Sequence, residues 1–446
     1  MAGDIRGITQ IPELRRRILM TFFFLAVYRL GVHVPVPGMR AGLFGSWVDQ
    51  GGDSILGLVN MFSGGALSQM SIFALGIMPY ISASIILQLL TVVVPTLERL
   101  SKEGEQGRRV ITQYTRYGTV ILAAIQGFGI AIGIENLTVN VTDPNLIAQY
   151  GLGGPGPASV VIQAGMGFRL LTVISLTAGT AFIMWLGEQI TERGIGNGIS
   201  LIIFAGIVGG IPRAVVSEFA RGIGVGGALL LFIFVIVVTL FVVYVERSQR
   251  RIPVHYAKRV VGRKVYGGQS THLPLKINTA GVIPAIFASS LLMFPLTIGQ
   301  FVTHPVVEKM RAWLSPTTIT YNMLFAGLVI FFSYFYTAIQ FNPNDVAENL
   351  KKHGGYIPGI RPGQRTAEFI DNVLSRLTFW GGLYVSLICV LPSLMMQEGV
   401  SFYFGGTSLL IVVGVALDTV AQIETHLIAR NYEGLMGSRR MRGRRS

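Results

Sequence analysis

Ten apolar segments divide this chain, and its basic residues lie almost entirely in every second gap between them. Of the 36 lysines and arginines, 29 lie in the N-terminal arm, in the C-terminal tail or in the gaps after the second, fourth, sixth and eighth segments. Cationic loops are retained on the cytoplasmic side of a membrane. The alternation therefore predicts a membrane protein with an even number of crossings and with both termini in the cytoplasm.

The apolar segments are long enough to cross the hydrocarbon core of a bilayer, which takes about 17–25 residues per helix. Each must be helical, because lipid does not tolerate unpaired backbone groups. The chain is 51% hydrophobic and 13% charged, whereas a soluble domain carries roughly 25% charged residues. We therefore expect an all-α polytopic membrane protein with ten transmembrane helices, centred on residues 18–34, 71–94, 117–134, 170–187, 195–211, 227–245, 277–299, 321–339, 379–397 and 406–424.

Ten crossings divide into five and five near residues 212–227. An odd number of crossings per half makes the second half enter the membrane inverted relative to the first. Inverted repeats place a pathway at their interface, near the bilayer midplane. We expect an N-terminal half at residues 1–215 and a C-terminal half at residues 216–446.

Two gaps on the basic side are long, and we call residues 246–276 the first basic loop and residues 340–376 the second basic loop. Neither can hold a catalytic domain, but both suit protruding hairpins that a large partner could grip. Their charge exceeds what orientation requires, although the alternative that it only sets topology stays open. The basic residues are Arg250, Arg251, Lys258, Arg259, Arg263 and Lys264 in the first loop, and Lys351, Lys352, Arg361 and Arg365 in the second.

Signatures of an enzyme or pump are missing from the sequence. No glycine is followed by lysine, which excludes a Walker A phosphate loop, and the six histidines lack metal-ligand spacing. Ion-coupled transporters need buried ionisable groups. Among the carboxylates, Asp418 alone lies within a span, and Glu188 and Glu424 fall at span ends. We expect no catalytic residues, cofactor or metal. A passive channel driven by a partner fits best, with a secondary solute transporter or a structural scaffold as alternatives.

Residues 54–70, between the first two spans, are moderately apolar but too short to cross. Backbone at membrane depth must be buried in protein or line a cavity, so we predict a half-helix folded back into the protein, with an external linker as the alternative. Bulky residues fall on one helical face, and two glycines interrupt the segment. These residues are Ile55, Leu58, Met61, Phe62, Gly64 and Gly65.

Seven strings closely resemble, in order, the SecY family, the channel subunits of the bacterial protein-translocation complex. They are FALGIMPYISASI (73–85), GEQGRR (104–109), QYTRYG (113–118), TERGIGNGIS (191–200), PLKINTAGVIPAIFASS (274–290), GYIPGIRPG (355–363) and FYFGGTSLLI (402–411). The resemblance implies a clamshell of two inverted five-helix halves around a central pore. It also implies that unfolded secretory polypeptides cross the bacterial plasma membrane there, and that apolar segments leave through a lateral gate of spans 2 and 3 against spans 7 and 8.

The resemblance assigns a pore ring that seals the constriction and a plug, residues 54–70, that rests beneath it. Isoleucine is stiff at χ1, and an apolar constriction excludes water and ions. Ile81 and Ile85 are four residues apart, as are Ile195 and Ile199. We therefore expect each of these two pairs to lie on one helix face. The ring residues are Ile81, Ile85, Ile195, Ile199, Ile286 and Ile411.

The resemblance also supplies partners. It implies companion subunits SecE and SecG, preproteins with signal sequences, and contact with membrane lipids. The basic loops are expected to meet a ribosome or the SecA motor ATPase, which would supply the energy. Arg263 and Lys264 match ribosome-contact positions, and Arg361 matches an arginine needed for motor coupling.

Overall fold

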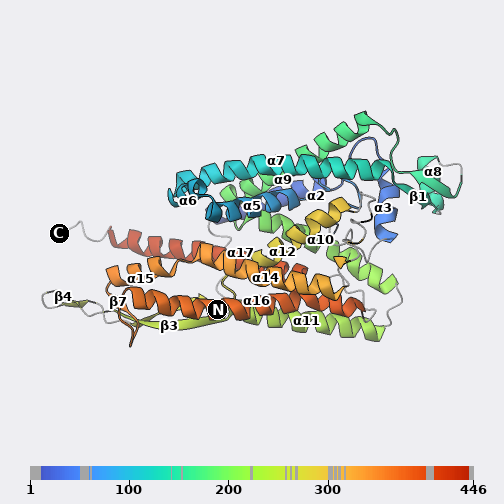
Figure 1. The fold of residues 1–446 in the computed structure, drawn as a ribbon. Coiled ribbons are helices and arrows are strands. Elements are labelled where there is room, and N and C mark those ends of the chain that lie inside the picture. Colours follow the sequence, from blue (N-terminus) through green and yellow to red (C-terminus); the bar gives the residue numbers. More distant parts are fainter. Residues whose placement is uncertain are drawn as a thin grey trace. The chain divides into compact units, whose positions relative to one another are not determined.

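The computed structural model describes most of the chain, and helices dominate the described part (Figure 1). The described residues are 12–50, 60, 63–141, 143–151, 154–220, 225–256, 259–261, 264–266, 270–299, 305, 309, 313–315, 318–397 and 406–440. They form two compact units. The first unit comprises Met1–Ser217, Ser290–Pro316 and Val415–Ser446, and the second comprises Glu218–Ser289 and Thr317–Gly414.

Each of the ten predicted spans contains a helix. In order they are α2 (Pro12–Gly31), α5 (Met78–Val93), α7 (Glu105–Glu135), α9 (Met166–Arg193), α10 (Gly198–Ala220), α11 (Val225–Arg247), α12 (Ile283–Gly299), α14 (Ile319–Gln340), α16 (Gln364–Gln397) and α17 (Thr407–Arg440). Among the described residues, six helical stretches have the length and composition of a membrane crossing. A seventh arises if α5 is joined to α6 (Pro95–Lys102) across a 100° bend. The count of ten crossings stays a prediction.

Helices α7 and α9 lie side by side in the first unit (Figure 1). A stripe of small residues, Ala123, Gly127 and Ala131, recurs every four positions on α7 and is buried. Small residues let helix backbones approach closely in membrane proteins. A Cβ at Gly127 would lie 3.6 Å from the Cα of Val173 on α9. The α7–α9 contact is therefore close along this stripe.

Ion pairs clamp the same two helices near both ends. The Arg116 guanidinium donates two hydrogen bonds of 2.8 Å to the Glu188 carboxylate, and Arg169 donates to Glu135 at 2.5 Å. Bidentate arginine–carboxylate pairs fix relative orientation as well as distance. These pairs set the register of α7 against α9.

The connection between α7 and α9 in the first unit contains three short elements. Strands β1 (Thr138–Val141) and β2 (Gly156–Ser159) form an antiparallel pair with α8 (Pro144–Tyr150) between them. Helix α3 (Ala41–Gln50) is tied to this group, because the backbone N–H of Gly42 donates to the Tyr150 hydroxyl at 2.9 Å.

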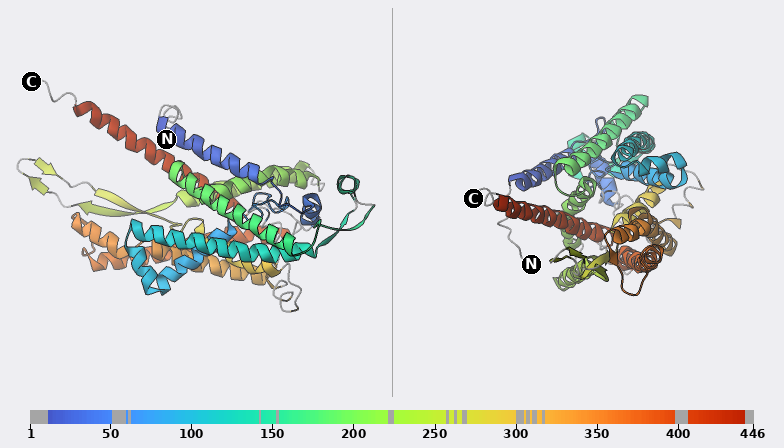
Figure 2. Two further views of the ribbon diagram at one scale, coloured as in Figure 1. Left: turned by 90° about the horizontal axis from the view of Figure 1, so that it is seen from above. Right: turned by 90° about the vertical axis from the view of Figure 1, so that its left-hand side faces the viewer.

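Both basic loops belong to the second unit. Strands β3 (Gln249–Tyr256) and β6 (Ser270–Lys276) form an antiparallel hairpin with β4 (Arg259–Val261) and β5 (Lys264–Tyr266) at its tip (Figure 2). The hairpin predicted for the first basic loop is confirmed. The hairpin expected for the second basic loop is not found among its described residues. They form α15 (Pro343–Lys352) and β7 (Gly355–Tyr356), and β7 pairs with β3, which gives the strand order β6-β3-β7.

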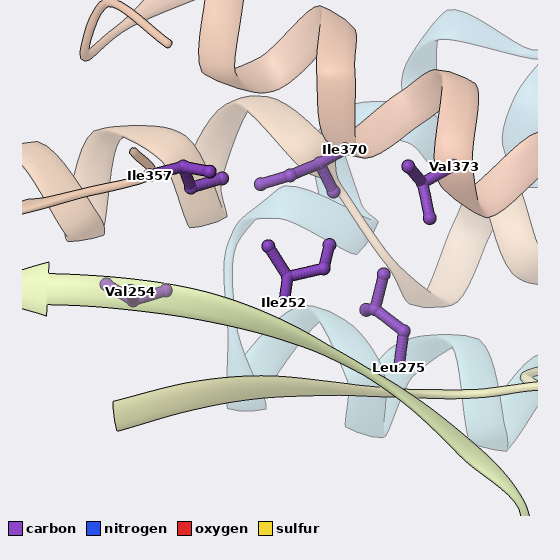
Figure 3. Packing of buried hydrophobic residues seen from close by; sticks show 6 residues of the cluster. All are labelled: Ile252, Val254, Leu275, Ile357, Ile370 and Val373. Carbon is purple, nitrogen blue, oxygen red and sulfur yellow. The ribbon is translucent and has the colours of Figure 1, made fainter. Parts of the chain in front are cut away.

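A hydrophobic cluster joins the two basic loops into one module (Figure 3). Alternate residues of β3 point into it, as period-2 burial requires. The cluster is also lined from β6, from the residue after β7 and from α16. Its members are Ile252, Val254, Leu275, Ile357, Ile370 and Val373.

Replacing Ile370, which is fully buried, with alanine should loosen this module. Leaving a cavity at a buried isoleucine costs about 2–5 kcal/mol. We expect faster proteolysis of the β3–β6 hairpin in membranes, measured by limited trypsin digestion. The control is Asp371→Ala at the neighbouring exposed position. Equal digestion rates for both variants would contradict the shared core.

Candidate functional site

Two of the proposed ring residues, Ile81 and Ile85, lie on α5, and both are buried. Their placement on one helix is confirmed. The helix begins at Met78, whereas the predicted span began at residue 71. Gly76 has φ +57°, a conformation that ends or delays a regular helix, and Pro79 occupies the first turn, where proline is favoured.

The expectation that Ile195 and Ile199 share a helix face is wrong. Helix α9 ends at Arg193 and α10 begins at Gly198, so Ile195 lies in the turn between them. Gly196 in this turn has φ +91°. The Asn197 side-chain oxygen accepts from the backbone N–H of Ile199 at 3.1 Å, as a helix N-cap does. The three glycines of this stretch allow the chain to turn where the apolar spacing alone suggested a continuous helix.

The second unit holds the other two, Ile286 on α12 and Ile411 on α17, both buried. A Cβ at Gly414 would lie 2.3 Å from Cγ2 of Val282, just before α12. Only glycine permits that approach. Ile286 lies about one helical turn after Val282, and Ile411 lies about one helical turn before Gly414. The structure therefore brings this pair of helices together within the second unit.

The predicted plug is described only in part. Ile55, Leu58, Met61 and Phe62 lie outside the described residues. The half-helix predicted for this segment is not found from Ser63 to Met70. The chain forms successive turns there, because Gly64 and Gly65 adopt φ +68° and +87°. Met70 is fully buried.

Two side chains of α2 hold this turn region. The Tyr28 hydroxyl donates to the Ser63 carbonyl at 3.1 Å, and the Arg29 guanidinium donates to the Gly64 carbonyl at 2.9 Å. A Cβ at Gly64 would lie 2.8 Å from the Cα of Gly206 on α10. The predicted site residues did not include Tyr28 and Arg29. An arginine within an apolar span was the available signal, because such charges are rare without a function.

The basic residues of the docking set are exposed wherever their side chains are described. Lys352 forms an ion pair with Glu348 at 3.0 Å. For Arg259 and Lys264 the structure describes only the backbone, in strands β4 and β5. Lys258 and Arg263 lie outside the described residues. The exposed members are Arg250, Arg251, Lys351, Lys352, Arg361 and Arg365.

Arg361 stands on an anchored turn. Ile357, four residues earlier, is buried in the hydrophobic cluster, and the Ile360 N–H donates to its carbonyl at 3.1 Å. On the other side, the Thr366 hydroxyl donates to the Arg361 carbonyl at 3.0 Å. The backbone is thus fixed while the guanidinium is left at the surface.

Among the residues that the structure describes, no three His, Cys, Asp or Glu side chains gather as they would around an ion. The described residues of the candidate site are buried apolar side chains and glycine turns, together with an exposed cationic module in the second unit.

The family model of SecY matches residues 71–420. The chain belongs to the SecY family. The protein translocase subunit SecY of Escherichia coli (strain K12) is 51% identical over 442 residues, which cover 97% of this chain and 96% of that relative. The resemblance seen in the seven sequence strings is confirmed.

Solved structures share the SecY fold with this chain. One, of a SecY protein whose plug domain is described as stabilising the closed state of the translocation channel, is 18% identical with a TM-score of 0.61, covering 94% of this chain and 96% of the other. Another, Sec61 in the canine ribosome–channel complex from the endoplasmic reticulum, is 15% identical with a TM-score of 0.58 and the same coverage.

Proposed function

We propose that this chain is a protein-conducting channel that passes unfolded secretory polypeptides across a bacterial plasma (inner) membrane and releases apolar segments into the bilayer. The observation that carries the proposal is the 51% identity, over 97% of the chain, to the protein translocase subunit SecY of Escherichia coli. The channel performs no bond chemistry. A ribosome or the SecA ATPase supplies the driving force.

The proposed architecture is a clamshell of two inverted halves, residues 1–215 and 216–446, with ten crossings and both termini in the cytoplasm. A helix in each of the ten predicted spans supports it. In this proposal, as the family resemblance implies, the second and third spans form the lateral gate with the seventh and eighth. A sufficiently apolar helix leaves through it because transfer from an aqueous pore to hydrocarbon is favourable.

The six ring isoleucines close the pore at rest, and residues 54–70 act as the plug. Burial of Ile81, Ile85, Ile195, Ile286 and Ile411 supports an apolar, dry constriction. The hydrogen bonds from Tyr28 and Arg29 hold one end of the plug segment. A plug needs such modest attachments, because an element that moves in function is drawn from the less stable parts of a fold.

The two basic loops form the docking surface for the ribosome and for SecA, while SecE and SecG are companion subunits within the membrane. The exposed arginines of the packed β3–β7 module support this assignment, as does the ribosome-bound state of the canine relative. Anionic lipid headgroups are further partners of the same cationic face.

Ribosome binding should weaken with salt, and less steeply once charges are removed from the docking surface. The binding constant falls with salt by a log–log slope of roughly 0.7–0.9 per phosphate contact. We expect Arg250→Gln with Arg251→Gln to reduce that slope by about 1–2 in a cosedimentation titration. The control is Lys102→Gln on α6, a cation paired with Glu98 at 2.6 Å. A slope unchanged by the double substitution would exclude β3 from the docking surface.

The test of the proposed function is reconstitution. Proteoliposomes that contain this chain with SecE and SecG should protect a preprotein from external protease when SecA and ATP are added, and should not do so without ATP. Uptake of small solutes along an ion gradient, with no protection of preprotein, would instead support a secondary transporter.

A further inference from the structure

The turn that carries Ile195 is a short glycine-rich stretch, and side chains from three helices bind its backbone. The Gly194 N–H completes α9 by donating to the Ile190 carbonyl at 2.8 Å. The next amides have no helical partner, because the chain leaves the helix there. Their partners come from α2, α9 and α17.

Thr21 of α2 binds the amide of Ile195 itself. Its hydroxyl accepts from the Ile195 N–H at 3.0 Å and donates to the Arg17 carbonyl at 3.0 Å. Both residues are buried, at 9% and 4% exposure. A Cβ at Gly194 would lie only 2.4 Å from the Thr21 hydroxyl oxygen, so glycine at that position is what lets the hydroxyl reach the amide.

Two further side chains fix the turn on either side of Ile195. The Gly196 N–H donates to the Gln422 side-chain oxygen on α17 at 2.9 Å. The Gly198 N–H donates to the Thr191 hydroxyl on α9 at 2.9 Å. All of these residues lie in the first unit.

Rigidity at this position has to come from such bonds. Ile81 and Ile85 are held by a continuous helix. Ile195 instead stands between Gly194 and Gly196, and glycine is the least conformationally restricted residue. A side chain that seals by packing must present its methyl groups in one place. Buried amides without partners are rare in native structures, and here the partners are side chains that single substitutions can remove.

We propose that Thr21 is a positioning residue of the pore ring: its hydroxyl fixes the turn so that Ile195 closes the constriction, with Gln422 as a second support. This inference rests on the proposed function, because it takes Ile195 as a sealing residue. It adds a role for α2, whose side chains were not among the ring positions.

The test measures ion conductance of the reconstituted complex in planar bilayers without substrate. We expect Thr21→Val, which keeps the shape but removes the hydroxyl, to raise resting conductance by about tenfold, since the buried Ile195 amide then loses its partner. Thr21→Ser retains the hydroxyl and should stay sealed. The matched control is Thr378→Val, at a buried threonine whose hydroxyl donates to the Leu374 carbonyl in its own helix at 2.8 Å.

Parental conductance of Thr21→Val, or an equal leak from Thr378→Val, would overturn the proposal. The conductance of Ile195→Asn tells whether the positioning role of Thr21 or the ring assignment of Ile195 is wrong. If Ile195→Asn leaks and Thr21→Val does not, the ring stands and the positioning role is wrong. If neither leaks, the ring assignment itself is wrong. Should Thr21→Val fail to accumulate in membranes, Gln422→Met decides: a leak supports the proposal, and a parental seal rejects it.

Discussion

Replacing Ile85 and Ile411 together with asparagine is expected to make the resting channel leak ions. Both side chains are almost completely buried, at 3% and 0% exposure, and in the proposed ring they keep the constriction dry. Each buried isoleucine contributes about 1.5–3 kcal/mol of preference for an apolar environment. Losing two of them should raise single-channel or bulk conductance in planar bilayers by at least about tenfold, because 1.4 kcal/mol corresponds to a factor of ten.

The specificity of this leak can be checked with two further variants. Ile236 on α11 lies outside the proposed ring, and its side chain is 43% exposed. Ile236→Asn makes the same substitution there and should leave conductance at the parental level. The pair Ile85→Leu and Ile411→Leu preserves apolar volume and should also stay sealed. Parental conductance in the double asparagine variant would remove Ile85 and Ile411 from the ring.

Reversing the charge of Arg361 is expected to abolish ATP-driven translocation and leave the fold intact. The side chain is exposed, and the bond that fixes its turn is made by its backbone carbonyl, so glutamate disturbs no buried contact. Placing like charges together at a docking interface costs several kcal/mol. We expect at least about a hundredfold fall in the rate of SecA-driven preprotein import into proteoliposomes.

Arg376→Glu is the matched control, because Arg376 is an exposed arginine of α16 at the far end of the same loop. It should retain import within the experimental scatter. Membrane insertion and resistance of the β3–β6 hairpin to trypsin should be equal for both variants. Normal import by the Arg361→Glu protein would refute a motor-coupling role for this turn.

The helices of this fold follow from hydropathy, because each apolar segment must satisfy its backbone within itself. Hydropathy does not reveal where such a helix starts. Residues 71–77 are apolar enough to extend α5, yet the positive φ of Gly76 sets them apart as turns. The hairpin of the first basic loop was predictable from its length and charge, whereas the pairing of β7 with β3 joins residues about one hundred positions apart.

The candidate site also contains residues that the sequence predicts and residues that it does not. The identities of the ring residues came from the family resemblance, since an isoleucine in a span is ordinarily a packing residue. Periodicity misplaced Ile195, because glycine conformations in the turn override the spacing by four. Thr21, Tyr28 and Arg29 act through bonds to backbone atoms far along the chain. The position of Arg29 within an apolar span was a signal, but no pattern in one sequence indicates the partners of these bonds.

The central claim is that an unfolded polypeptide passes through the ring of six isoleucines. The direct measurement replaces the single cysteine, Cys389, with serine and places one cysteine at each ring position in turn. A preprotein stalled during SecA-driven import, carrying a thiol-reactive crosslinker, is then tested against each variant, with Ile236→Cys on α11 as the reference. We predict crosslinks at all six ring positions and none at Ile236. Stalled import with no crosslink at any ring position would contradict the account.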